Sequence, residues 1–102
     1  TNLRNADLEG AVLRRADLFR ANLSSAELTD AVLEGADLTG ASFGNAVLEG
    51  AELGSAIVVH TDFSGADLSG TSAAGSRWWG TQCPDSDTVS ADVRLEFSCM
   101  EK

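Results

Sequence analysis

The stretch Ala36-Asp37-Leu38-Thr39-Gly40 shows the pattern that decides the fold, because the pattern returns every five residues through most of the chain. Leu or Phe occupies every fifth position from Leu3 to Leu68 except one, which is Val58, and Ala73 follows as the fifteenth central residue. Ala, or Thr in three repeats, stands two positions before each central residue. The register therefore holds without a slip up to residue 75.

A period of five excludes both an α-helix and a flat strand. Residues five apart on a helix are rotated by roughly 140°, so the central residues would wind around every face. On a continuous strand the odd spacing would send successive central residues to opposite faces. The backbone must bend once per repeat, and the Gly, Asn, Ser and Asp residues that end the repeats are typical of turns. We expect a coil with Ala and the central residues inside.

The pattern A-(D/N)-L-x-x, as in Ala6-Asp7-Leu8-Glu9-Gly10 and Ala66-Asp67-Leu68-Ser69-Gly70, resembles the pentapeptide-repeat family. The resemblance implies an all-β fold, a right-handed quadrilateral β-helix with twenty residues per coil and about four coils. Stacked coils of this kind pair their backbones as in a parallel sheet. We expect the β-helix over residues 1–80 and a small C-terminal cap over residues 81–102.

The central side chains are expected to fill the core. Phe43 and Phe63 lie one coil apart, so their rings should stack. Trp78 stands at the centre of the last, degenerate repeat, where it can close the lumen. A lumen filled by Ala and Leu leaves no space for a cofactor. The core ladder that we single out consists of Leu18, Leu38, Phe43, Phe63 and Trp78.

The run W-x-x-x-x-C-P-D, from Trp78 to Asp85, is similar to a tail that follows the repeats in secreted bacterial and thylakoid-lumen members of the family. Cys83 and Cys99 are an even number of cysteines close enough to close one loop, and we predict a disulfide between them. The pair and the tail together favour a secreted, periplasmic or thylakoid-lumen location and leave a cytoplasmic one open. Residues 88–98 alternate in polarity like a short strand, while their apolar spacing also allows a one-turn helix.

The charge of the chain limits its partners. Its formal net charge is −9, which argues against direct binding to nucleic acid, because phosphate contacts require Lys and Arg. Residues 21–75 hold eight acids and neither Lys nor Arg. No apolar run approaches the ~18 residues that a membrane span requires. Protein surfaces remain the expected class of partner.

We predict no catalytic, cofactor-binding or metal-binding residues. The only histidine, His60, falls at a turn and is expected to point outward into solvent. A metal site built from His60 and Asp62 would lack further nitrogen or sulfur ligands. The acids are expected on convex outer faces, where nothing excludes water or separates their pKa values as acid–base catalysis requires. The sequence therefore indicates a protein that is not an enzyme.

One outer face is expected to differ from three polar ones. Under a twenty-residue coil, the residues after the centre on this face are Phe19, Thr39, Val59 and Trp79, and Ile57 stands just before a centre. We predict that Phe19, Ile57, Val59 and Trp79 contact a protein partner or a second copy; the alternative is that Trp79 folds under the C-terminal tail and that Phe19 is an isolated surface residue. The leading hypothesis is a non-enzymatic, rigid protein-binding or scaffold module. The alternative is an acidic mimic of DNA that binds DNA gyrase or another topoisomerase, a role known in the family, which aligned carboxylates make physically sensible.

Overall fold

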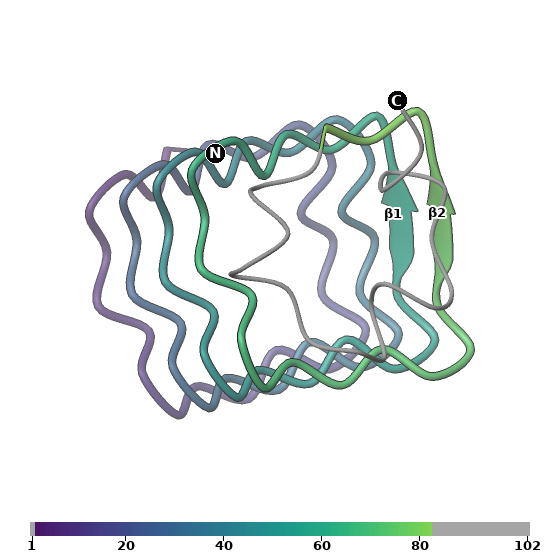
Figure 1. The fold of residues 1–102 in the computed structure, drawn as a ribbon, viewed down its shortest axis with the longest axis horizontal. Helices are drawn as coiled ribbons and strands as arrows, with labels where there is room; N and C mark the ends of the chain where they lie inside the picture. Colours follow the sequence, from purple (N-terminus) through teal and green to yellow (C-terminus); the bar gives the residue numbers. More distant parts are fainter. Residues whose placement is uncertain (1, 83–102) are drawn as a thin grey trace.

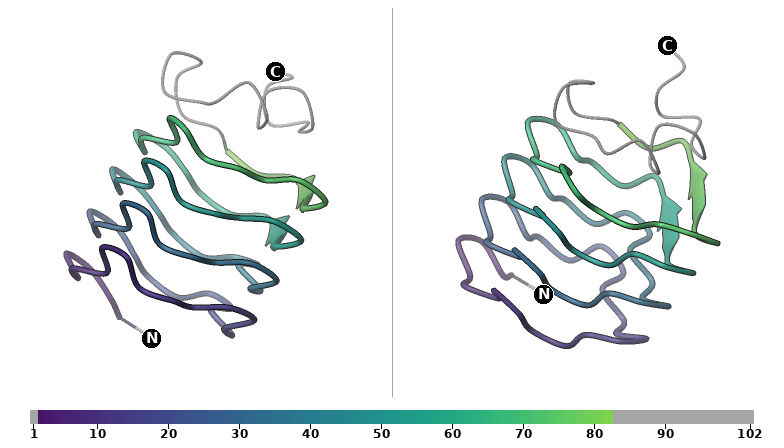
Figure 2. Two further views of the ribbon diagram at one scale, coloured as in Figure 1. Left: turned by 90° about the horizontal axis from the view of Figure 1, so that it is seen from below. Right: turned by 60° about the horizontal axis from the view of Figure 1, so that its bottom comes forward.

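The structure, a computed structural model, describes residues 2–82, and these form a coil that winds around a filled lumen (Figure 1). Successive coils stack along one axis (Figure 2). Parallel bridges join residues twenty apart throughout, from Asn2 with Asn22 to Asp62 with Gln82. This architecture confirms the predicted all-β solenoid with four repeats per coil. The described residues contain no helix that could cross a membrane.

Two strands are continuous enough to be named, and both lie on the same side of the coil. They are β1 (Ile57–Val59) and β2 (Arg77–Trp79), which pair in parallel with Val58 opposite Trp78 (Figure 1). Elsewhere each repeat contributes a single bridge residue before the chain turns. Pairing continues to Gln82, two residues beyond the expected end of the repeats at residue 80. Cys83, Cys99 and residues 88–98 lie outside the described residues.

Each coil bonds to both of its neighbours through the backbone. The amide of Leu28 donates to the carbonyl of Val47 on the next coil at 2.7 Å, whereas the amide of Glu27 donates to the carbonyl of Ala6 on the previous coil at 2.9 Å. Ala31 then donates to Leu28 within the turn at 2.9 Å. Repetition of this scheme satisfies the buried amides without a conventional sheet, which is why five residues suffice for one repeat.

A left-handed residue stands at every corner. Every fifth residue from Asn5 to Gly80 has a positive φ, between 54° and 75°. Glycine adopts this region without strain, and Asn and Asp tolerate it better than other residues. This requirement explains the glycines that end half of the repeats. Arg15, Arg20 and His60 also occupy corners, at a conformational cost that glycine avoids.

The Asp or Asn that precedes a central residue caps the following turn. The Asp37 carboxylate accepts the backbone N–H of Thr39 at 3.0 Å, and Asp62 accepts that of Ser64 at 2.9 Å. A side chain that bonds the backbone two residues ahead stabilises a turn locally. Five of the acidic residues that give the chain its negative charge therefore also stabilise turns. The residues that cap in this way are Asn2, Asp7, Asp17, Asn22, Asp37, Asp62 and Asp67.

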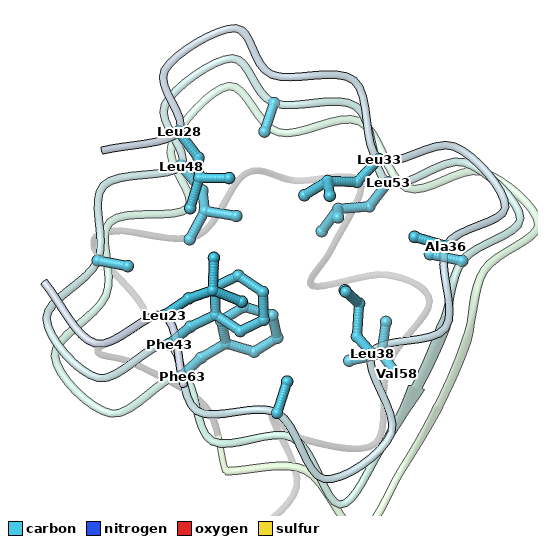
Figure 3. Close-up of a cluster of buried hydrophobic side chains, with 14 of the residues drawn as sticks. Leu23, Leu28, Leu33, Ala36, Leu38, Phe43, Leu48, Leu53, Val58 and Phe63 are labelled. Carbon is cyan, nitrogen blue, oxygen red and sulfur yellow. The ribbon is translucent and has the colours of Figure 1, made fainter. Parts of the chain in front are cut away.

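The core consists of the inward side chains of all four sides (Figure 3). Leu38, Phe43 and Phe63 are fully buried, and Leu18 is nearly so. The rings of Phe43 and Phe63 stack at 5.0 Å between centroids, and Trp78 stacks on Phe63 at 5.3 Å. The lumen is therefore packed, and the large indole ring covers the aromatic column at its C-terminal end.

Three threonines replace the small inner alanine near the C-terminal end of the coil. The Thr61 hydroxyl donates to the carbonyl of Leu38 at 2.7 Å, and Thr81 donates to that of Val58 at 2.8 Å. Thr71 makes the equivalent bond to Leu48 at 3.0 Å. Each hydroxyl thereby gains a partner, so these polar groups are buried without an unpaired donor.

Candidate protein-binding face

The predicted interface residues lie on one side of the coil, the side that carries β1 and β2. We call Phe19, Ile57, Val59 and Trp79 the aromatic wall. Phe19 is 51% exposed, Ile57 38% and Trp79 64%, while Val59 is half-buried. Thr39 lies between Phe19 and Val59 in the same column, so the wall has two apolar parts rather than one continuous patch. The structure thus brings the four residues to one face, with unequal exposure.

Two bulky corner residues contact the aromatic rings of the wall. The guanidinium carbon of Arg20 lies 5.2 Å from the centroid of the Phe19 ring, a cation–π distance. The imidazole of His60 meets the indole of Trp79 edge to face, with centroids 5.1 Å apart. Both Arg20 and His60 hold a positive φ in the same corner column.

The other three faces are less uniformly polar than expected. Val12 is 64% exposed on the neighbouring face, so the expectation of three polar faces is wrong there. Val12 stands just before a central residue, as Ile57 does. The repeat pattern alone does not show whether an apolar residue at this position is isolated or belongs to a patch. No second large apolar residue on that face is exposed in the part of the chain that the structure describes.

The face opposite the aromatic wall is acidic. It is built from the repeats centred on Leu8, Leu28, Leu48 and Leu68, two repeats away from the wall in a coil of four (Figure 3). Its outward and corner positions carry six acids and no Lys or Arg. The molecule is therefore electrically polarised across the coil, a feature that reading the charge along the chain does not reveal. The six acids are Asp7, Glu9, Glu27, Asp30, Glu49 and Asp67.

A shallow depression of about 450 Å³ lies at the corner next to Val12's face and is lined by Arg14, Arg15, Glu34, Gly35 and Ser55. Arg14 and Glu34 pair across it at 3.3 Å, and both side chains are more than half exposed. Such an exposed pair contributes little to stability. Glu34 balances the charge of Arg14, which leaves the exposed Arg15 as the remaining charged group in the lining.

The described residues hold no group of three or more His, Cys, Asp and Glu side chains that could bind a metal ion. His60 lies at an exposed corner, and the ring contact that the structure gives it is with Trp79. The strongest candidate site in the described region is therefore the aromatic wall, which suits contact with another macromolecule better than chemistry on a small one.

Comparisons with known proteins point to one family. A family model of pentapeptide repeats matches residues 1–35 and 32–70. A pentapeptide repeat protein from the cyanobacterium Cyanothece 51142 is 33% identical with a TM-score of 0.57, over 86% of this chain and 52% of that one. The pentapeptide repeat protein HetL from Nostoc, involved in regulating heterocyst differentiation, is 31% identical with a TM-score of 0.44, over 82% of this chain and 47% of that one.

A pentapeptide repeat protein from the thylakoid lumen of Arabidopsis thaliana is 27% identical with a TM-score of 0.40, over 83% of this chain and 55% of that one. No curated protein sequence matches. The chain thus spans about half the length of these three solved structures.

Proposed function

We propose, from the premise that the chain belongs to the pentapeptide-repeat family, that it is a rigid, non-enzymatic scaffold that binds a protein partner through the aromatic wall. The filled lumen and the double backbone bonding of each coil support rigidity, because neither leaves a hinge. A rigid surface loses little conformational entropy on binding. The coil would then serve to hold the wall in a fixed geometry.

The observation that carries this proposal is the concentration of exposed apolar groups on one side. Three of the four large hydrophobic side chains exposed in residues 2–82 belong to the wall, namely Phe19, Ile57 and Trp79. Two more residues, Arg20 and His60, accept an unfavourable backbone conformation beside it. Aromatic residues and Arg are enriched at protein interfaces, where they supply most of the binding free energy.

A paired-variant experiment tests this proposal. The double variant Phe19→Ser with Val59→Ser removes apolar contact from both parts of the wall, and the control Glu27→Gln with Glu49→Gln changes the opposite face. We expect the immobilised wall variant to lose captured or self-associated protein while the control retains it. Equal binding by both variants, with unchanged melting curves, would exclude the wall as the binding surface.

We also propose an oxidising compartment, in the secretory path, the periplasm or the thylakoid lumen. The support is the cysteine pair near the C-terminus, because disulfides persist in such compartments. The test is whether the protein from its native source carries the Cys83–Cys99 bond. Two free thiols in protein extracted under alkylating conditions would contradict this location.

The acidic face favours a second candidate function, mimicry of DNA toward a topoisomerase. Six carboxylates on one side of a rod could occupy a groove that normally holds phosphates. Two of them, Asp7 and Asp67, also cap turns, so their positions are set by the backbone. A gyrase supercoiling assay tests this candidate, with the Glu27→Gln and Glu49→Gln variant as the control. Supercoiling that continues at a large excess of the protein would rule it out.

A further inference from the structure

We infer that the partner of the aromatic wall is a second copy of this chain, docked wall to wall with the two coil axes antiparallel. This inference rests on the proposed function, because it assigns an occupant to the same face. It follows from the order of residues along the wall, which is self-complementary when the two coil axes are antiparallel and all four rows overlap.

The wall has four rows, one per coil, whose order is fixed by parallel pairing. In the column before the centre, parallel backbone bridges join Asp17 to Asp37, Asp37 to Ile57, and Ile57 to Arg77. In the column after the centre, β1 and β2 place Val59 beside Trp79, and the same twenty-residue interval places Phe19 and Thr39 in the first two rows. The column before the centre therefore has an acid at one end and a base at the other, and the column after the centre has an aromatic ring at each end.

A two-fold axis that runs along the strand direction reverses the rows and keeps the columns. It sets the first row of one copy against the last row of the other. Asp17 then faces Arg77 of the second copy, and Phe19 faces Trp79, each contact occurring twice. In the middle rows Thr39 faces Val59. Each end of the symmetric contact thus holds one pair of opposite charges and one pair of aromatic rings, and the two ends are equivalent, as a two-fold interface requires.

The charges and exposures of the residues favour this contact. Asp17, Phe19, Arg77 and Trp79 are all exposed, so all four are accessible to a second copy. Arg77 has no ion-pair partner within the described residues, where Arg14 with Glu34 is the pair found. The acidic faces lie opposite the walls, so wall-to-wall docking places them on the outer sides of the pair. Two chains of net charge −9 thereby keep their most acidic surfaces as far apart as possible.

Other arrangements of two copies satisfy fewer groups. A two-fold axis parallel to the coil would set Asp17 against Phe19 and leave the acid without a charged partner. A shift of one row along the antiparallel arrangement would pair Asp37 with Arg77 but leave Phe19 outside the contact. Of the antiparallel registers, the full overlap is therefore the one that uses every exposed apolar group of the wall, and unlike the parallel arrangement it also pairs Asp17 with Arg77. It also places Asp37 against Ile57, a mismatch that limits the strength of the contact.

The contact is small, and the expected dimer is correspondingly weak. Four rows at the ~4.8 Å spacing of paired strands span about 19 Å along the axis. Full overlap would bury on the order of 800–1,000 Å² in total, at the low end for specific protein interfaces. Association should therefore appear in the upper micromolar range and weaken as salt rises, since two charge pairs contribute to it.

Charge reversal across the contact tests this inference by analytical ultracentrifugation between about 10 µM and 1 mM, a range chosen for a weak interface. Asp17→Arg alone and Arg77→Asp alone should each raise the dimer dissociation constant by roughly tenfold or more, because each places like charges together twice. The double variant Asp17→Arg with Arg77→Asp should restore association. Asp17→Asn, which keeps the turn-capping oxygen, should weaken association without lowering the melting temperature.

Three results would overturn the inference. They are a monomer at every concentration, a double variant as weak as the single ones, or rescue by Asp37→Arg with Arg77→Asp instead, which would show the shifted register. The proposed function fails differently, through unchanged capture by the Phe19→Ser and Val59→Ser variant. A monomer whose wall still captures another protein would keep the proposed function and reject the second copy as its partner.

Discussion

The corner glycines offer a sharp test of the stacking scheme, because their environments differ only in the residue one coil earlier. Gly65 and Gly70 lie in the same coil with φ values of 70° and 68°. A Cβ built on Gly70 would meet only the backbone of Gly50, at 3.6 Å or more. A Cβ built on Gly65 would overlap the side-chain oxygen of Asn45 and lie 3.3 Å from its Cγ. Corner side chains thus lean along the axis over the next corner.

The two alanine substitutions should differ by the cost of displacing Asn45. Gly70→Ala incurs the penalty of a left-handed Ala, roughly 1–2 kcal/mol. Gly65→Ala incurs the same penalty and also forces the Asn45 side chain away from its preferred rotamer, which costs about 0.5–1.5 kcal/mol more. For a domain of this size that difference corresponds to roughly 2–12 °C in melting temperature. Adding Asn45→Gly to Gly65→Ala should remove the difference.

Thermal unfolding followed by circular dichroism measures this difference, with urea unfolding as the second measurement. The double-mutant cycle measures the effect of Gly65→Ala both in the original sequence and in the Asn45→Gly background, so that any effect of Asn45→Gly alone cancels. Equal destabilisation by Gly65→Ala and Gly70→Ala would refute the reasoning, as would a cycle with no coupling between residues 45 and 65. Either result would mean that corner side chains do not restrict the corner above them.

Four further predictions concern the core, a turn cap, a corner beside the wall and the cysteine pair. Phe63→Ala should destabilise the coil by roughly 3–5 kcal/mol in urea unfolding, because it empties the middle of the aromatic column. Asp37→Asn should leave the melting temperature nearly unchanged, whereas Asp37→Ala should cost about 1 kcal/mol through loss of the turn cap, and equal effects would contradict the capping role. His60→Gly should raise the melting temperature, since it relieves a left-handed residue, while it weakens binding at the wall. Cys83 and Cys99 should form a disulfide; its loop contributes roughly 3 kcal/mol in the chain-entropy model, and two alkylatable thiols in the oxidised protein would refute it.

The fold could be predicted because one signal dominates the sequence. A five-residue period in Ala and Leu is compatible with neither helix nor strand, and no other interpretation keeps the central residues on the inside. The stacking of Phe43 on Phe63 could be expected once a twenty-residue coil was assumed. That coil length came from the resemblance to the family, because a five-residue period alone does not say how many repeats close one turn.

Other features could not be read from the period. The pattern contains Asp or Asn before the central residue, yet it does not say whether the side chain faces a ligand or the chain itself. The structure shows the second, since the Asp37 oxygen bonds the Thr39 amide. Likewise, Val12 and Ile57 occupy equivalent positions, and only the neighbouring columns show that one belongs to a wall and the other stands alone. These distinctions depend on contacts between coils rather than on order along the chain.

Two of the three bulky corner residues lie beside the aromatic wall. Glycine satisfies the corner geometry at half of the sixteen corners, and small polar residues fill most of the others. Arg15, Arg20 and His60 depart from this rule; Arg20 and His60 share one corner column, and each contacts an aromatic ring of the wall, whereas Arg15 lies in another column. Glycine at position 20 or 60 would relieve the left-handed conformation and would also remove the ring contact. At these two corners the local geometry of the turn is thus connected to the binding surface, and His60→Gly is the substitution that separates the two effects.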